Sequence, residues 1–107
     1  MPDGGAARYR VRLSVPRVGG TRAWGSAAAG DFERRLAAQA SATVTGPHIE
    51  GQSRRGRDYV RVTIVMTVTA GDVGQALTIA WRALRKAAGD DIAGWDAAGA
   101  SAEVSPA

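Results

Sequence analysis

The sequence predicts an α+β domain in which two helices cover one face of a four-stranded antiparallel sheet. Alternation of apolar and polar residues, strict over residues 8–15 and regular over residues 58–69, predicts two strands. Apolar residues at helical spacing predict two helices, over residues 31–40 and 73–88. With the remaining segments, the order is strand, helix, strand, strand, helix, strand. Two right-handed βαβ units joined by a hairpin produce the proposed sheet.

The composition is that of one small globular domain. The chain has 107 residues, of which 45% are hydrophobic and 22% charged, which is enough for a single hydrophobic core. We expect residues 1–7, which are small and polar, to form a disordered tail, and residues 8–107 to form the domain.

Several classes of protein are disfavoured. The chain contains no cysteine, which excludes disulfides and thiolate metal sites. No apolar run approaches the roughly 20 residues that cross a bilayer, and the N-terminal residues lack the apolar segment of a secretory signal. We therefore expect a cytoplasmic protein with no membrane partner, no metal and no cofactor.

Positive charge is concentrated in the first two thirds of the chain. Residues 1–70 contain eleven arginines and five acidic residues, whereas residues 71–107 contain three basic and five acidic residues. All but one of the fourteen basic residues are arginine, which suits planar contacts with phosphate or carboxylate. An alternative explanation is the Ala-, Gly- and Arg-rich composition of a GC-rich genome.

The first strand and first helix follow from the pattern of residues 8–40. The strand directs Tyr9, Val11, Leu13 and Val15 to the core and Arg8, Arg10, Arg12 and Ser14 to the other side, and it ends at Pro16. The Gly-rich residues 16–30 are either a functional loop or a shorter loop followed by a helix that starts near Ser26, and the sequence leaves both alternatives open. In the helix, Asp31 is the predicted N-cap, and the buried stripe contains Phe32, Leu36 and Ala40, extended by Ala28 and Ala29.

The second and third strands form the central hairpin. The segment SATVTGPHIEGQ is interrupted by Gly46 and Pro47, and because proline cannot donate to a sheet ladder, this strand belongs at an edge. A basic loop, GQSRRGR, follows. The third strand is long and regular and should be central, with the even residues Val60 to Val68 facing the helices.

The second helix and last strand complete the sheet. Asp72 and Gln75 have the spacing of a capping box, and Gly89 suits a left-handed stop. The apolar stripe, bordered by Trp81, comprises Val73, Ala76, Leu77, Ala80, Leu84, Ala87 and Ala88. The last strand is expected to begin at Trp95, with Ala98, Ala100, Ala102 and Val104 inward and Glu103 near Arg8 or Arg10.

This order of elements is that of the ferredoxin-like plait, whose strand order is 4-1-3-2. From Arg8 to Val104 the chain resembles the group of small ferredoxin-like domains that includes RNA-recognition modules, ACT-type regulatory domains and dimeric α+β barrel proteins. The stretch RGRDYVRVTIV is similar to the basic-glycine signature of RNA-recognition modules. It departs from that signature at Arg57 and Asp58, while Tyr59 matches the middle aromatic position.

The resemblance implies that the sheet face away from the helices is the binding surface. For RNA or DNA, the candidate residues are the arginines and the aromatic residue expected there, namely Arg8, Arg10, Arg12, Arg54, Arg55, Arg57, Tyr59 and Arg61. The same face suits a second copy of the chain, through Tyr59, Thr63, Val65, Thr67 and Thr69. A symmetric dimer requires the arginines to lie at its rim or to pair with acids.

We favour a non-enzymatic homodimeric accessory or interaction protein, with nucleic-acid binding as the alternative. No combination of nucleophile, base and orienting group can be assembled from the sequence. A further alternative is a regulatory domain for a small ligand, with Trp24 and His48 as pocket residues. Trp24 has a second interpretation, in which it anchors the Gly-rich loop to the body of the domain.

Overall fold

The computed structural model describes residues 6–17, 26–55 and 58–107. The predicted disorder of the N-terminal tail falls mostly on residues outside this description, as do the predictions for Trp24 and Arg57. No helix among the described residues is long and apolar enough to cross a membrane.

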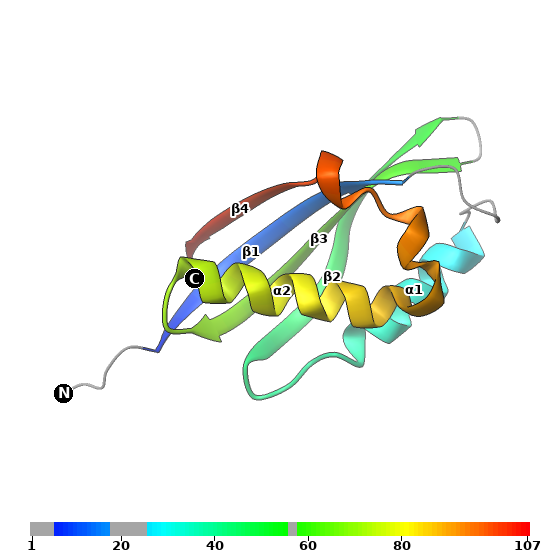
Figure 1. Cartoon of the computed structure of the whole chain (residues 1–107). Coiled ribbons are helices and arrows are strands. Elements are labelled where there is room, and N and C mark those ends of the chain that lie inside the picture. Colours follow the sequence, from blue (N-terminus) through cyan, green and yellow to red (C-terminus); the bar gives the residue numbers. More distant parts are fainter. Residues whose placement is uncertain (1–5, 18–25, 56–57) are drawn as a thin grey trace.

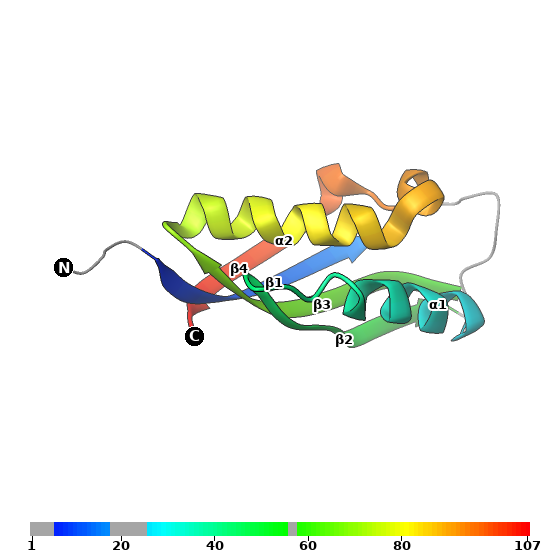
Figure 2. The ribbon, with the colours of Figure 1, turned by 90° about the horizontal axis from the view of Figure 1, so that it is seen from below.

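The predicted α+β fold is confirmed. Strands β1 (Ala7–Pro16), β2 (Val44–Arg55), β3 (Asp58–Ala70) and β4 (Ser101–Pro106) form one antiparallel sheet in the order β2-β3-β1-β4. This is the ferredoxin-like order read from the opposite edge. Helix α2 (Val73–Ala88) runs along the sheet, and α1 (Ser26–Ala37) lies beside β2 (Figures 1 and 2).

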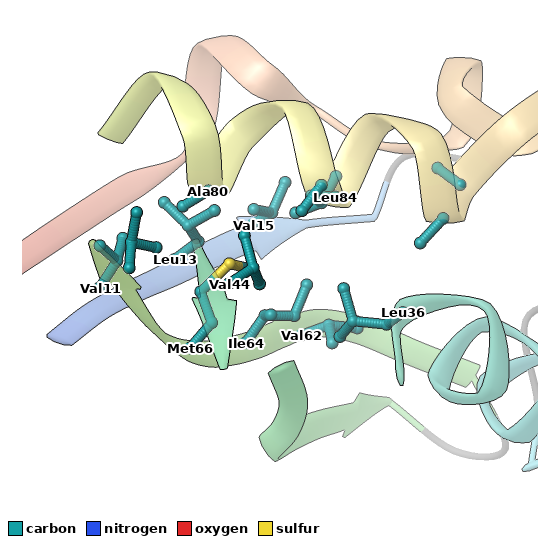
Figure 3. Close-up of a cluster of buried hydrophobic side chains, with 14 of the residues drawn as sticks. Val11, Leu13, Val15, Leu36, Val44, Val62, Ile64, Met66, Ala80 and Leu84 are labelled. Atoms are coloured by element: carbon teal, nitrogen blue, oxygen red, sulfur yellow. The ribbon is translucent and has the colours of Figure 1, made fainter. Parts of the chain in front are cut away.

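The alternation of β1 and β3 divides the sheet into two faces as predicted. Val11, Leu13 and Val15 pair with Met66, Ile64 and Val62, and all six side chains are buried. They meet Leu36 of α1 and Ala80 and Leu84 of α2 in one core (Figure 3). Arg8, Arg10, Arg12 and Arg61 therefore share the face that points away from the helices.

The first helix begins earlier than its predicted cap. Helix α1 starts at Ser26, so Asp31 lies inside the helix, where it pairs with Arg34 instead of capping the N-terminus. Phe32 and Leu36 are buried as expected. Ala40 is exposed because the helix has already ended at Ala37.

The second helix has the predicted ends. The Asp72 carboxylate accepts a hydrogen bond from the Gln75 backbone N–H at 2.7 Å, and Gln75 in turn accepts one from the Gly71 N–H. Gly89 follows the helix with a φ of 54°, as predicted. Val73 is 52% exposed, contrary to the prediction, because it lies in the first turn, where the helix has not yet reached the core.

Strand β2 lies at the sheet edge, as Pro47 required, and it is longer than predicted. The expected loop over residues 51–57 is mostly strand, because β2 continues to Arg55. The register of β2 against β3 shifts at two sites along residues 45–51, each of which adds one residue to β2. Gly46 occupies the first bulge with a φ of 59°. Such a conformation favours glycine.

The C-terminal segment differs most from the prediction. Trp95 is buried but does not begin a strand. Residues Gly89–Gly94 and Ala97–Gly99 form 3-10 turns, and β4 starts at Ser101. The Trp95 ring packs 4.8 Å from the Phe32 ring, and the Arg17 guanidinium lies 5.1 Å from the Trp95 ring centroid. Ala98 is exposed as a result, while Val104 packs against the core.

Candidate functional site

The first candidate site is the sheet face that the helices leave uncovered, here called the open sheet face. Directly paired residues in antiparallel strands share a face, so strand pairing assigns its members. The assigned residues are Arg8, Arg10, Arg12 and Ser14 of β1, Arg61, Thr63, Val65, Thr67 and Thr69 of β3, Thr45, His48, Gly51 and Ser53 of β2, and Ser101, Glu103 and Ser105 of β4. Glu50 of β2 has no directly paired partner, and its contacts with Arg10 and Arg12 place its side chain on this face.

Glu50 joins two of the arginines on this face. Nη2 of Arg12 donates to Oε2 of Glu50 at 2.9 Å, and Nε of Arg12 lies 2.9 Å from Oε1 without hydrogen-bond alignment. Nη2 of Arg10 donates to the same carboxylate at 3.3 Å. Glu50 is on β2 and the arginines are on β1, so these contacts cross β3. These ion pairs therefore link β1 and β2 across β3 on the open face.

The β2 bulge explains why Glu50 reaches this position. Ile49 pairs with Ile64 and Gly51 with Thr63, which leaves Glu50 as the extra residue between two paired positions. The Ile49 backbone N–H donates to the Glu33 carboxylate of α1 at 3.1 Å, so the helix supplies a partner for the backbone at the bulge. The sequence contained a partial signal, since an edge strand already broken by Gly46 and Pro47 has another glycine directly after Glu50.

Glu103 supplies the second acid. Its Oε2 lies 3.7 Å from Nη1 of Arg12, its direct neighbour across β1 and β4. The predicted approach of Glu103 to Arg8 or Arg10 is therefore wrong, because its partner is Arg12, the next residue on the same face of β1. In the observed register of β4 against β1, Arg12 pairs with Glu103 and Arg10 pairs with Ser105.

The network changes the ionisation of its members. The hydrogen bond from Arg12 lowers the pKa of Glu50 below its ordinary value of 4.5, and the charges of Arg12 and Arg10 act in the same direction while desolvation opposes them. The same hydrogen bond raises the pKa of Arg12. Both groups thus remain charged at neutral pH.

Val65 lies beneath this network. It is on the open face between Arg12 and His48, yet only 3% of its surface is exposed. Because the helices are on the other side, neighbouring side chains must cover it, and the Glu50 contacts to Arg10 and Arg12 cross β3 in this region. A face that looks open in the ribbon is therefore closed over its apolar residue.

Other predicted site residues are distributed as follows. Arg61 donates to the Ser14 hydroxyl at 3.0 Å, and Arg8 is exposed. Tyr9 pairs with Val68 on the core face, so it is not a stacking platform for bases. Arg54, Arg55 and Tyr59 belong to the β2–β3 hairpin, but their side chains are outside the description. His48 is exposed, with Nδ1 2.7 Å from the Gly46 carbonyl oxygen.

A second candidate site was not predicted. A groove of about 870 Å³ lies between α2 and β4, on the helix side of the sheet. Apolar side chains and three cationic residues line it. Among the described residues, His48 is not part of the groove lining. In the described part of the chain, no cluster of three or more His, Asp or Glu side chains is arranged to hold a metal ion.

Comparison with known proteins assigns no family. No family model and no curated protein matches the chain. The fold resembles a putative aminohydrolase from methicillin-resistant Staphylococcus aureus, with 20% identity and a TM-score of 0.46 over 94% of this chain and 29% of that one. It also resembles the de novo designed protein Foldit4, with 16% identity and a TM-score of 0.42 over 95% and 96% of the two chains.

A third structure has a similar backbone arrangement. It is a hydantoinase/carbamoylase family amidase from Burkholderia ambifaria, with 21% identity and a TM-score of 0.37 over 97% of this chain and 28% of that one. The chain thus spans less than a third of each of the two enzymes. These matches assign no activity to it.

Proposed function

We propose that the chain is a non-enzymatic interaction protein that forms a symmetric homodimer through its open sheet face. The observation that carries this proposal is the pairing of Arg10 and Arg12 with Glu50 and Glu103 within one chain. Like charges facing each other across a two-fold axis repel, so an arginine-rich face can meet its own copy only when acids neutralise it. Here Glu50 and Glu103 are part of the same surface, and they offset two of its four described arginines.

The size of the face sets the expected strength of the dimer. Ten residues of β1 span about 33 Å, and four strands span about 19 Å, which gives roughly 600 Å² per copy. The total of about 1,200 Å² is at the lower limit of specific interfaces. We therefore expect a weak dimer, with a dissociation constant in the micromolar range.

The centre of the face is suited to sheet stacking. Thr63, Thr67 and Thr69 are half-buried in β3, and β-branched residues pack well between sheets. Thr67 lies between Arg10 and Thr45 in the direction across the strands. A large charged side chain at this central position would hold two copies apart.

The test is sedimentation velocity over a micromolar to millimolar concentration series. The wild type should dimerise with little dependence on salt, and Thr67→Arg should remain monomeric. Thr78→Arg is the matched control, because it makes the same change at an exposed position of α2. A wild type that stays monomeric throughout, or a Thr67→Arg variant that dimerises as well as Thr78→Arg, refutes the proposal.

Nucleic-acid binding is the second candidate, and the excess of cations favours it. The described side chains of the open face include four arginines and two glutamates, and the sequence places Arg54, Arg55 and Arg57 in or next to the β2–β3 hairpin. If Arg8, Arg61 and these three contact phosphates, binding of a single-stranded oligomer should weaken with salt at a slope of about −3.5 in log K against log salt.

One set of measurements separates the two candidates. Sedimentation is repeated with a mixed RNA or DNA oligomer at two salt concentrations. A monomer that binds the oligomer only at low salt would favour nucleic-acid binding and exclude the dimer. A dimer that ignores both salt and oligomer would do the reverse.

A further inference from the structure

The α2–β4 groove has features of a ligand site that the open sheet face lacks. Its walls come from α2, from the two 3-10 turns and from β4, and Leu13 of β1 contributes to its floor. The lining residues are Leu13, Leu77, Thr78, Trp81, Arg82, Arg85, Lys86, Gly89, Ile92, Ala97, Ala100, Ser101 and Ala102. In Figure 1, the segment after α2 turns back along the chain to reach β4. A volume of about 870 Å³ is within the usual range for small-molecule sites.

The groove exists because β4 and the turn before it carry small side chains. Ala97, Ala100 and Ala102 line it from this side, and none of their side chains is large enough to fill the space beside α2. A β4 strand with larger inward residues would close the groove and extend the core.

Its apolar wall is accessible. Leu77 and Trp81 of α2 are half-buried, packing partly on the core, and Ile92 is 37% exposed. A half-buried tryptophan can contact a ligand over a large apolar area, so a ligand that covers this wall should carry an apolar group.

The positive charge of the groove comes from one side of α2. Arg82, Arg85 and Lys86 are exposed, and their side chains line the same groove. Among the described side chains, none of these three cations has a carboxylate partner within ion-pair distance. Their stems can lie along the apolar wall while their charges remain in water.

We propose that the α2–β4 groove binds an amphipathic monoanion: a molecule with an aromatic or aliphatic body and a single carboxylate, sulfonate or sulfate. The body lies against Leu77, Trp81 and Ile92, and the acidic group contacts Arg82, Arg85 and Lys86. An apolar ligand without charge would leave the cations unused. An inorganic anion would leave the apolar wall exposed to water.

A pair of fluorescent probes separates the apolar and charged contributions. These are 8-anilinonaphthalene-1-sulfonate and N-phenyl-1-naphthylamine, which share an arylnaphthylamine body and differ in the sulfonate. We expect saturable one-to-one binding of the sulfonate probe and about tenfold weaker binding of the neutral one. The estimate follows from exposed ion pairs, which contribute up to about fivefold each. Near-ultraviolet circular dichroism establishes that each variant is folded, because the sulfonate probe also binds molten states.

Two variants test the assignment to this groove. The triple variant R82Q/R85Q/K86Q should lower the affinity for the sulfonate probe about tenfold and leave that for the neutral probe unchanged. Its control, R34Q/A38E/A42E, lowers the net charge by the same three units at exposed positions that neither line the groove nor belong to the open sheet face, and should change neither affinity. Ala102→Phe should abolish binding of both probes. Ala98→Phe, at an exposed position that does not line the groove, should not.

Specific results would overturn the proposal. Asp90 and Asp91 follow α2 in the sequence, and if their charges offset the cations, the two probes will bind wild type equally, which refutes anion recognition. Equal loss of sulfonate-probe affinity in both triple variants means that net charge alone is responsible. Unchanged binding to Ala102→Phe shows that the probes occupy another site.

Discussion

Substitution of Val65 by alanine tests whether the open sheet face is closed over its apolar residue. Val65 is 3% exposed, so the variant loses two buried carbon groups, which corresponds to about 1.5 kcal/mol of unfolding free energy. Little should be added for a cavity, because the covering side chains of Arg12 and Glu50 are partly exposed and can settle into the space. Val62→Ala, fully buried on the other face of the same strand, should cost more, about 2 to 3 kcal/mol.

Urea unfolding measures this difference. With a slope of about 1 to 3 kcal/mol per molar urea, Val65→Ala should lower the midpoint by roughly 1 M. All variants are compared at one protein concentration, because self-association raises apparent stability. The substitution is repeated in a Glu50→Ala background, where Val65 is no longer covered and its loss should matter less. A cost below about 0.5 kcal/mol, as at exposed positions, or an equal cost in both backgrounds, refutes the shielding of Val65 by the ion pairs.

Two further predictions concern the same strand region. The pKa of Glu50 is lower in the folded chain than its ordinary value of 4.5, so its pairing stabilises the fold above that value and the contribution is lost as the pH falls through the folded pKa. The difference in unfolding free energy between wild type and Glu50→Gln should thus shrink as the pH falls below 4.5; a difference independent of pH would contradict it. Gly46→Ala should cost about 1 to 2 kcal/mol, because φ is 59° and an added Cβ meets no atom within 4 Å, so the cost is that of the backbone conformation alone. Gly51→Ala, with equal space and no positive φ, is the control in thermal unfolding, and equal losses would show that the bulge does not require glycine.

The sequence predicted those parts of the fold that depend on periodic burial. Alternation in β1 and β3 assigned each residue to a face, and the structure agrees from Val11 to Val15 and from Val62 to Val68. Pro47 predicted the edge position of β2, because a residue without an N–H cannot donate to a neighbouring strand and is therefore tolerated mainly at sheet edges and bulges. These signals are local consequences of backbone geometry and need no knowledge of distant residues.

The errors occurred where an element could start or end at more than one place. Asp31 has the chemistry of an N-cap, but Ser26 to Gly30 extend the helix, which leaves Asp31 inside it. A buried tryptophan is compatible with the start of a strand, yet the ring of Trp95 packs against Phe32 and Arg17, and the residue lies between the two 3-10 turns. In both cases a buried or polar residue type was compatible with two local conformations, and tertiary packing selected one of them.

The candidate sites were less predictable, because each depends on a relation between elements. The placement of Glu50 depends on a bulge that adds one residue to β2. The alternation of apolar and polar residues does not reveal where such an extra residue is inserted, so it cannot predict the face on which Glu50 lies. The groove depends on what is absent from β4, namely side chains large enough to fill the space beside α2. The basic residues of α2 were expected to face outward, but no pattern in α2 alone indicates that an open apolar wall lies beside them.

The two proposed sites can be tested independently because they lie on opposite faces of the sheet, and β1 contributes residues to both. Arg12 and Leu13 are consecutive, and successive residues of a strand point to opposite faces, so Arg12 belongs to the ion-pair network while Leu13 contributes to the groove floor. A substitution at Thr67 is thus on the far side of the sheet from the groove, and substitutions at Arg82, Arg85 and Lys86 are on the far side from the open face. If Thr67→Arg removed both dimerisation and probe binding in a folded chain, the probe site would have to lie at the interface between copies, and its assignment to the α2–β4 groove would be wrong.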